Sequence, residues 1–126
     1  MAAKSIAPVL HVSDLARSLV YFTSVLGFTE NFRFGSYAGI SLDEVDLHLS
    51  ADSVYQRAVG GGTAYIFCDE VDEYYAQLKE NGAILKGEPE DAPYGMREFT
   101  ASDPDGNHLS FGCDVEGIGE PGIHGS

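Results

Sequence analysis

Apolar and polar positions repeat twice along the chain in the same order. Residues 9–28 and 66–83 each begin with a short apolar stretch, continue into an amphipathic helix that starts at acidic residues, and stop at a glycine. The apolar positions of the two helices recur at helical spacing; they are Leu15, Leu19, Phe22 and Leu26, then Val71, Tyr74, Tyr75 and Leu78. Three short strand-like runs follow each helix. The pattern predicts an α+β fold in which a βαβββ unit occurs twice within a single domain over residues 1–113.

Caps and turn residues bound the expected elements. In the first unit, about residues 5–50, we expect a strand over 5–12, a helix from its cap at Asp14 to about Leu26, and strands over 30–34, 37–42 and 45–50. In the second unit, about 63–113, we expect a strand over 63–69, a helix from Val71 to Asn81-Gly82, and strands over 84–88, 96–101 and 107–113. A linker over 51–62 joins the units, and the glycine-rich tail over 114–126 is predicted to be mobile.

The predicted strands have two different faces that alternate with period two. In 45–50, Val45, Leu47 and Leu49 alternate with Asp46, His48 and Ser50, and the runs 63–68 and 108–113 alternate in the same way. The second face carries His, Ser, Thr and aromatic side chains but few long charged ones. One solvated face is ordinary in an antiparallel sheet, but this composition is typical of a pocket with an apolar lining and a few polar groups. We therefore expect this face to line a binding cleft.

The chain is strongly acidic. It has 20 Asp and Glu residues against 7 Lys and Arg, so its formal net charge is −13. Such a charge repels nucleic acid and anionic membranes and attracts cations, although solubility alone is an equally simple interpretation. No apolar run approaches the roughly 18 residues of a membrane span, and the N-terminus has no signal-peptide pattern. We therefore expect a cytoplasmic protein without nucleic-acid or membrane partners, in which Cys68 and Cys113 stay reduced.

Two motifs connect this pattern to a known family. Residues 7–28 read APVLHVSDLARSLVYFTSVLGF, and residues 97–111 read REFTASDPDGNHLSF. Together, at this spacing, they resemble the vicinal-oxygen-chelate superfamily, which contains glyoxalase I, fosfomycin-modifying enzymes, extradiol dioxygenases and bleomycin-resistance proteins. The resemblance covers about residues 5–113. It implies paired βαβββ modules whose curved sheets form a cleft.

The resemblance also implies where the metalloenzymes of this superfamily would bind their metal. The ligand positions on the first, fourth, fifth and eighth strands correspond here to Ala7, His48, Thr63 and Ser110. A catalytic divalent ion needs at least three good nitrogen, carboxylate or thiolate donors, and His48 alone cannot hold one. We therefore expect no metal and no cofactor. A rearranged cluster of His11, His48 and His108 is the alternative, and it would leave a divergent metalloenzyme of the lyase or oxidoreductase type open.

Residues 27–51 and 92–99 resemble the bleomycin-resistance branch of the superfamily. Its members are metal-independent dimers that sequester aromatic, DNA-damaging antibiotics in grooves between two subunits. The resemblance implies an aromatic clamp of Phe32 and Tyr94, where Tyr94 replaces a tryptophan, and a hinge at Pro8 for strand exchange between subunits. The expected ligand-binding residues are Phe32, Tyr37, His48, Ser50, Thr63, Tyr65, Tyr94, Gly95 and Ser110.

The function that this resemblance implies is sequestration without catalysis. We expect a homodimer that binds a cationic, aromatic antibiotic of the bleomycin type and thereby confers resistance. A protein that binds a different aromatic or cationic small molecule is the second hypothesis. The divergent metalloenzyme, with glyoxalase-like or dioxygenase-like chemistry, is the third.

Overall fold

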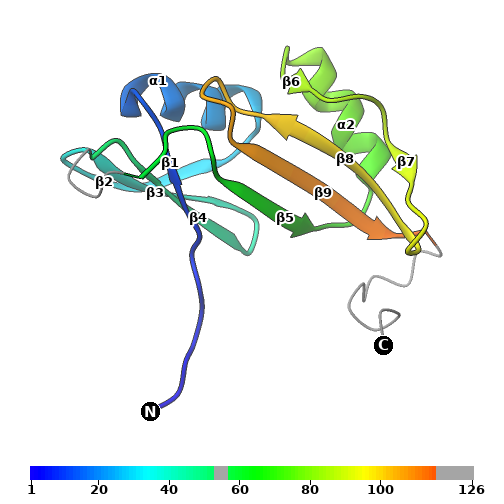
Figure 1. Cartoon of the computed structure of the whole chain (residues 1–126), viewed down its shortest axis with the longest axis horizontal. Coiled ribbons are helices and arrows are strands. Elements are labelled where there is room, and N and C mark those ends of the chain that lie inside the picture. The colour runs from blue at the N-terminus through cyan, green and yellow to red at the C-terminus, as the bar shows by residue number, and fades with distance from the viewer. Residues whose placement is uncertain (53–56, 116–126) are drawn as a thin grey trace.

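The computed structural model describes residues 1–52 and 57–115, and Figure 1 shows two modules that lie side by side. The first module consists of β1 (Val9–His11), α1 (Leu15–Val20), the π-helical segment η1 (Tyr21–Val25), β2 (Thr29–Phe34), β3 (Tyr37–Leu42) and β4 (Val45–Ser50). The second module consists of β5 (Thr63–Phe67), α2 (Val71–Glu80), β6 (Ile84–Leu85), β7 (Glu90–Asp91), β8 (Met96–Ser102) and β9 (His108–Asp114).

Both sheets have the same topology. The first has the strand order β1-β4-β3-β2 and the second β5-β9-β8-β6, with the short β7 also paired to β8. In each module the opening strand runs parallel to the closing strand, which in turn pairs antiparallel with its other neighbour. The predicted α+β fold of paired βαβββ modules is therefore confirmed. Strand β7 is an addition that the alternation of apolar and polar residues did not predict.

Both helices begin where predicted, but the first one changes from an α-helix to a π-helix partway along. The Asp14 carboxylate accepts from the Arg17 N–H at 3.1 Å and caps α1. The α-helix ends at Val20, and the rest of the predicted helix is the π-helical η1. Within it the Thr23 hydroxyl donates to the Leu19 carbonyl at 2.7 Å, a local bond that competes with the regular helical ladder. Within the described ranges, no helix is both long and apolar enough to cross a membrane.

Several predicted strand boundaries are wrong by a few residues, each for a local reason. Strand β1 begins at Val9 instead of residue 5, because Pro8 has no N–H and only its carbonyl joins the ladder, accepting from the His48 N–H at 2.8 Å. Strand β5 ends at Phe67, since the chain turns into α2 through the left-handed Glu70. The strand predicted over 84–88 is reduced to Ile84–Leu85, and Gly87 beyond it has a φ of 105°.

The predicted linker and tail fall only partly within the described residues. Strand β9 extends to Asp114, which the prediction had placed in the tail. The remainder of the predicted mobile tail from residue 116 onward, and residues 53–56 of the predicted linker, lie outside the described residues.

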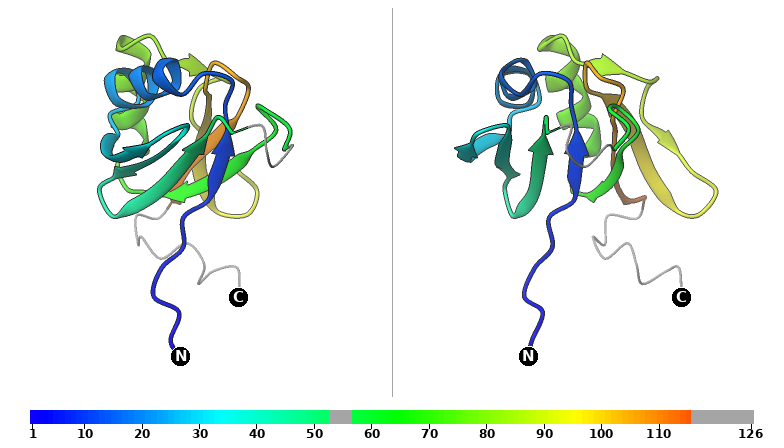
Figure 2. Two further views of the ribbon diagram at one scale, coloured as in Figure 1. Left: turned by 90° about the vertical axis from the view of Figure 1, so that its left-hand side faces the viewer. Right: turned by 60° about the vertical axis from the view of Figure 1, so that its left-hand side comes forward.

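The core lies between the helices and one side of the two sheets. All four apolar positions predicted for the first helix are buried, as are Val71 and Leu78 of α2. Tyr74 and Tyr75 are partly buried and contact the sheet edge-on, with ring centroids 4.9 Å and 5.4 Å from Phe111 and Phe99 respectively. Figure 2 shows α1 and α2 on the same side of the molecule. Within residues 1–52 and 57–115, no helix covers the opposite side of the two sheets.

A buried asparagine in the β8–β9 turn joins the two modules. The Asn107 amide nitrogen donates to the His11 carbonyl at 3.0 Å and to Asp103 Oδ2 at 2.9 Å. Its amide oxygen accepts from the Gly62 N–H at 2.8 Å. Asn107 and Asp103 are 0% and 1% exposed, so the bond between them is shielded from water, and the bonds to His11 and Gly62 are partly shielded. One side chain thus connects the end of β1 with the start of β5 and with the turn predicted at residues 103–106.

Two tyrosines add further bonds between the modules. The Tyr21 hydroxyl donates to the Ser102 carbonyl at 2.7 Å and accepts from the Ile84 N–H at 2.9 Å. The Tyr74 hydroxyl donates to the Leu26 carbonyl at 2.7 Å. Burial raises the pKa of Tyr21, so this phenol remains a hydrogen-bond donor through the physiological range. The modules therefore keep a defined relative position, which determines how their uncovered sheet faces are arranged.

We expect Asn107→Ala to lower the free energy of unfolding by about 2–4 kcal/mol, measured by chemical denaturation. The substitution removes the hydrogen bonds of the Asn107 side chain to the Gly62 N–H, the His11 carbonyl and Asp103 Oδ2, and it leaves a cavity at a fully buried position. The His11 carbonyl keeps its bond from the Gly60 N–H, and Asp103 Oδ1 keeps its bonds from two backbone N–H groups, so the main loss falls on the Gly62 N–H and Asp103 Oδ2. Asn31→Ala is the matched control, because Asn31 is an exposed residue of β2. The account of the junction is wrong if both variants unfold at the same denaturant concentration.

Candidate functional site

The sheet face opposite the helices carries the side chains that the alternation predicted. Leu47 and Leu49 of β4 are buried in the core, whereas His48 between them is only partly buried on the other face. The strand register places Gly39 beside His48 and Phe32 beside Gly39. We call this uncovered face of both sheets the aromatic face; its rings are Phe32, Tyr37 and His48 in the first module and Tyr65, Phe67 and Tyr94 in the second.

In the first module the three rings of the aromatic face form one cluster. The Tyr37 hydroxyl lies 2.8 Å from His48 Nδ1, which fixes both side chains. The Phe32 ring lies nearly parallel to Tyr37, with centroids 6.4 Å apart and planes at 17°, and edge-on to His48 at 5.3 Å. Phe32 is nevertheless 45% exposed. A well-supported ring with a free side is suited to stacking against a flat ligand.

Glycines beneath two of the rings allow them to lie flat on the sheets. A Cβ at Gly39 would come within 2.0 Å of Phe32 Cε2, and a Cβ at Gly112 would come within 2.0 Å of the Tyr65 hydroxyl. Any side chain at either position would lift the ring away from the strand. The two modules thus use the same device, although the glycines are on β3 in one and on β9 in the other.

In the second module a carboxylate lies between two tyrosines. The Tyr65 hydroxyl donates to Glu98 Oε1 at 2.7 Å, and the Tyr94 hydroxyl donates to Glu98 Oε2 at 2.5 Å. Phe67 extends the group, with its ring centroid 5.1 Å from that of Tyr65. Burial raises the pKa of Tyr65, and the hydrogen bond to Glu98 raises that of Tyr94. Both phenols therefore remain protonated donors.

Glu98 was missed by the sequence reasoning, although a signal was present. It alternates with Thr100 on β8, and the register places it opposite Gly112, on the aromatic face. A period-two pattern read along β8 would have assigned it to the same face as Ser110. Acidic residues are so frequent in this chain that a single carboxylate did not stand out.

The other predicted residues of the second module lie close to this group. Ser110 pairs with Tyr65 across the β5–β9 ladder, and its hydroxyl is 2.7 Å from that of Thr100. Thr63 is exposed on β5. Gly95 has a φ of 87° in the turn that presents Tyr94. The structure places these predicted residues near Glu98 and its two tyrosines, and their role in binding stays a prediction.

Ser50 and His11 lie at a separate small cavity of the first module. The cavity has a volume of about 250 Å³ and is lined by Val9, His11, Tyr37, Ser50 and Arg57. Ser50 is buried, and its hydroxyl accepts from the Asp52 N–H at 3.3 Å. Tyr37 is therefore shared between this cavity and the ring cluster that contains Phe32.

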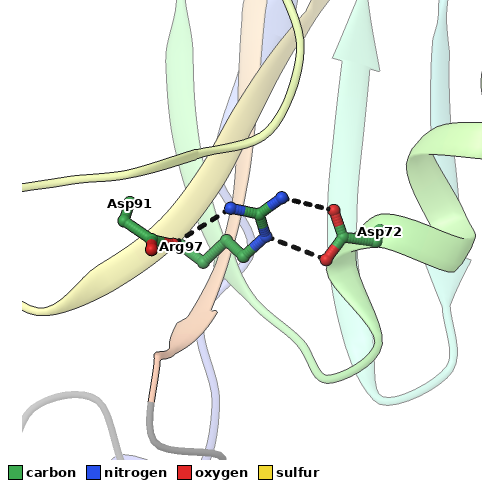
Figure 3. A network of polar contacts seen from close by, with 3 residues as sticks. All are labelled: Asp72, Asp91 and Arg97. Carbon is green, nitrogen blue, oxygen red and sulfur yellow. Dashed lines mark hydrogen bonds and ion pairs between the residues drawn. The ribbon is translucent and has the colours of Figure 1, made fainter.

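An arginine fixes the hairpin that carries Tyr94. Figure 3 shows Arg97 of β8 between Asp72 of α2 and Asp91 of β7. Its Nε and Nη2 donate to the two oxygens of Asp72 at 2.8 Å each, and its Nη1 donates to Asp91 Oδ1 at 3.0 Å. The hydrogen bond with Arg97 lowers the pKa of Asp72, so the pair stays charged. A bidentate pair of this kind holds one geometry, and here it orients the β7–β8 turn.

The two predicted clamp residues are not brought together within one chain. Phe32 is on β2, the outer strand of the first sheet, and Tyr94 precedes β8 in the turn after β7. Figure 1 shows β2 and β7 near opposite ends of the longest axis. A single molecule therefore cannot hold one aromatic ligand between Phe32 and Tyr94.

The alternative histidine cluster is not formed. Throughout residues 1–52 and 57–115, no group of three or more His, Cys, Asp or Glu side chains is placed to hold a metal ion. His48 is engaged with Tyr37, whereas His108 is on the other sheet and pairs with Thr63. Of the four implied ligand positions, only His48 has a strong donor side chain.

The predicted hinge and thiols have clear local settings. The strand after Pro8 pairs with β4 of its own chain, and Figures 1 and 2 show the segment before it extending away from the body. Exchange of this strand between subunits stays a prediction.

Cys68 and Cys113 are free and partly buried. Burial, with smaller contributions from Cys113 and Asp69, raises the pKa of the Cys68 thiol to about 11.

Comparison with known proteins agrees with the fold and with the motifs. Residues 5–111 match the family described as the Glyoxalase/Bleomycin resistance protein/Dioxygenase superfamily. The chain therefore belongs to this superfamily, whose members include both enzymes and binding proteins. Its paired modules are those of the glyoxalase/bleomycin resistance fold.

Three relatives illustrate the similarity. A bleomycin resistance protein of Geobacillus stearothermophilus is 26% identical over 121 residues, which cover 82% of this chain and 92% of that protein. The bleomycin-binding protein of Streptomyces verticillus, solved with copper(II)-bleomycin, has a TM-score of 0.71 at 22% identity and covers 87% of this chain and 97% of its own. TnmS3, an antibiotic binding protein of Streptomyces sp. CB03234, has a TM-score of 0.76 at 24% identity, with 91% and 99% covered.

We expect Gly39→Ala to displace the Phe32 ring while the fold stays intact. The new methyl group would overlap the exposed end of a ring that can rotate outward, so the free energy of unfolding should change by less than about 1 kcal/mol. Aromatic-ring NMR resonances of Phe32 and Tyr37 report the displacement. Gly61→Ala is the control, since a Cβ there meets Ala58 only at ordinary contact distances, the nearest 3.5 Å. Unchanged ring resonances in Gly39→Ala would contradict the packing described here.

Proposed function

We propose that this protein binds a cationic, aromatic antibiotic of the bleomycin type on its aromatic face, without a metal or cofactor, and so confers resistance by sequestration. The observation that supports this most is the set of rings held flat over glycines, with exposed apolar surfaces on one sheet face. Binding sites for small molecules are typically apolar and aromatic, with a few placed polar groups. Here Tyr37, His48 and Glu98 supply the polar groups.

The comparisons support the same class of ligand. The curated relative is a bleomycin resistance protein, and two similar structures are antibiotic-binding proteins. The net charge of −13 favours a cationic ligand, because the field of an acidic protein raises the local concentration of cations. Another aromatic cation would satisfy the same features, and a panel of antibiotics distinguishes the two possibilities.

The proposal requires two copies of the chain. Since Phe32 and Tyr94 lie near opposite ends of one molecule, a clamp that uses both must combine Phe32 of one copy with Tyr94 of the other. A second feature favours association. A groove of about 490 Å³ lies between the N-terminal segment, β4 and β5, and its lining includes Ile6, which is 84% exposed, and Phe67, which is 57% exposed. Exposed apolar side chains gathered in this way mark an interaction surface.

We expect Phe32→Ala and Tyr94→Ala each to weaken antibiotic binding by roughly 1–3 kcal/mol, or about fivefold to 150-fold in Kd. Each removes an exposed ring that would stack on the ligand, so stability should change little. Titration calorimetry with metal-free bleomycin and a small panel of aromatic antibiotics measures the effect. Val20→Ala is the control, because Val20 is 64% exposed on α1, on the opposite side. If both ring variants bind the best ligand as tightly as the parent, the clamp is wrong.

The same titration separates sequestration from metal-dependent chemistry. The parent protein is titrated after dialysis against a chelator and again after loading with zinc or nickel and removal of the excess ion, with an aromatic antibiotic of the panel that does not chelate metals, because bleomycin itself binds metal ions such as copper(II). Sequestration predicts equal affinity in both states, because the antibiotic would contact rings and Glu98 instead of a metal. Binding that appears only with metal, or consumption of the compound during titration, would favour the divergent enzyme.

We expect a homodimer with twice the 13.5 kDa mass of the chain in sedimentation experiments over about a hundredfold range of concentration. Ile6→Asp should shift the protein toward monomer, since it places a charge in the apolar groove. Val20→Asp adds the same charge on the helical side and should leave the dimer intact. A parent protein that stays monomeric at every concentration would contradict the two-copy groove.

A further inference from the structure

We propose that Glu98, held between Tyr65 and Tyr94, is the residue that selects a cationic group on the ligand. This inference rests on the proposed function and assigns the position at which the positive charge of the ligand binds. The three residues come from different elements, β5, the β7–β8 turn and β8, and they meet on the aromatic face.

The hydrogen-bond pattern leaves only acceptors for a ligand. Both phenolic hydrogens are donated to Glu98, one to each carboxylate oxygen. A carboxylate has about four lone-pair positions, so roughly two remain free, and each phenol oxygen keeps its own lone pairs. A group that approaches Glu98, Tyr65 and Tyr94 therefore finds acceptors and no free donor among these three side chains. Ammonium, guanidinium and amidinium groups, which only donate, match it, and anions do not.

The surrounding side chains favour the same kind of group. A cavity of about 320 Å³ beside Glu98 is lined by one basic residue, Lys86, and by the carboxylates of Glu88, Glu90, Asp91 and Glu98, among other residues. Asp91 is already paired with Arg97, and the other three carboxylates still outnumber Lys86 in this lining. The rings of Tyr65, Phe67 and Tyr94 add aromatic faces, which attract a cation held against them.

The arrangement is held in place before any ligand arrives. Gly112 allows Tyr65 to reach Glu98 across the sheet, because a Cβ there would overlap its hydroxyl. Arg97, the residue before Glu98, points to the helical side and fixes the β7–β8 turn through Asp72 and Asp91. Tyr94 is 60% exposed, so its hydroxyl could bond to water instead, and its bond to Glu98 is not needed to satisfy a buried polar group. Acceptors that are held in place on an exposed surface lower the cost of binding a ligand, whereas they add little to the stability of the fold.

The test compares a bleomycin that carries a terminal amine with the same compound after acetylation of that amine. Calorimetry gives the Kd of both for the parent, for Glu98→Gln and for Glu80→Gln. Glutamine keeps the shape of Glu98 and an acceptor oxygen but removes the charge. We expect Glu98→Gln to lose about tenfold or more in affinity for the amine form, with affinity for the acetylated form within about twofold of the parent. Glu80→Gln, which removes the same charge from the end of α2, should leave both affinities within about twofold.

The outcomes separate this inference from the proposed function. If the parent binds both compounds and Glu98→Gln weakens them equally, Glu98 has a structural role and the inference is overturned. If Glu80→Gln lowers the affinity for the amine form as much as Glu98→Gln does, the selection is due to net charge and the inference is again overturned. If the parent binds neither compound, the proposed function itself fails, and the assignment of Glu98 fails with it.

Discussion

The buried amide of Asn107 is the constraint on which the arrangement of this protein depends. It connects the end of β1, the start of β5 and the β8–β9 turn, three segments that belong to different modules or join them. The Ser13 hydroxyl adds a bond of 2.6 Å to Asp105 in the same turn. Because the modules are held here and by the tyrosines of α2 and η1, their sheets keep a fixed relation. The uncovered faces can therefore act as rigid supports for a ligand.

Rigid support matters because stacking energies are small. An aromatic pair contributes about 0.5–1.5 kcal/mol beyond the buried area, and the ordering of a loose ring would offset much of that. The glycines beneath Phe32 and Tyr65, the bond between Tyr37 and His48 and the carboxylate between two phenols reduce this cost in advance. The exposed rings therefore lose little further conformational freedom when a ligand binds.

The parts that were predictable from the sequence depend on periodicity and local chemistry. Leu15, Leu19, Phe22 and Leu26 revealed the buried helical stripe, Asp14 its cap, and the alternation in β4 the face on which His48 lies. The parts that were missed depend on contacts between distant segments. The role of Asn107 follows from where the first module places the His11 carbonyl, and that of Glu98 from tyrosines 33 and 4 residues away. No local pattern encodes the pairing of Asn107 with His11 or of Glu98 with Tyr65, nor the separation of Phe32 from Tyr94.

The central claim is that the aromatic face, and not the core or another cavity, receives the ligand. The most direct measurement is NMR of ¹³C-labelled phenylalanine and tyrosine rings during titration with metal-free bleomycin. The account predicts that the ring signals of Phe32, Tyr65 and Tyr94 shift, while those of Phe22 and Phe111, which are fully buried, do not. The account is contradicted if the rings of the aromatic face stay unchanged while Tyr74 shifts, because Tyr74 lines a separate cavity of about 410 Å³ beside α2.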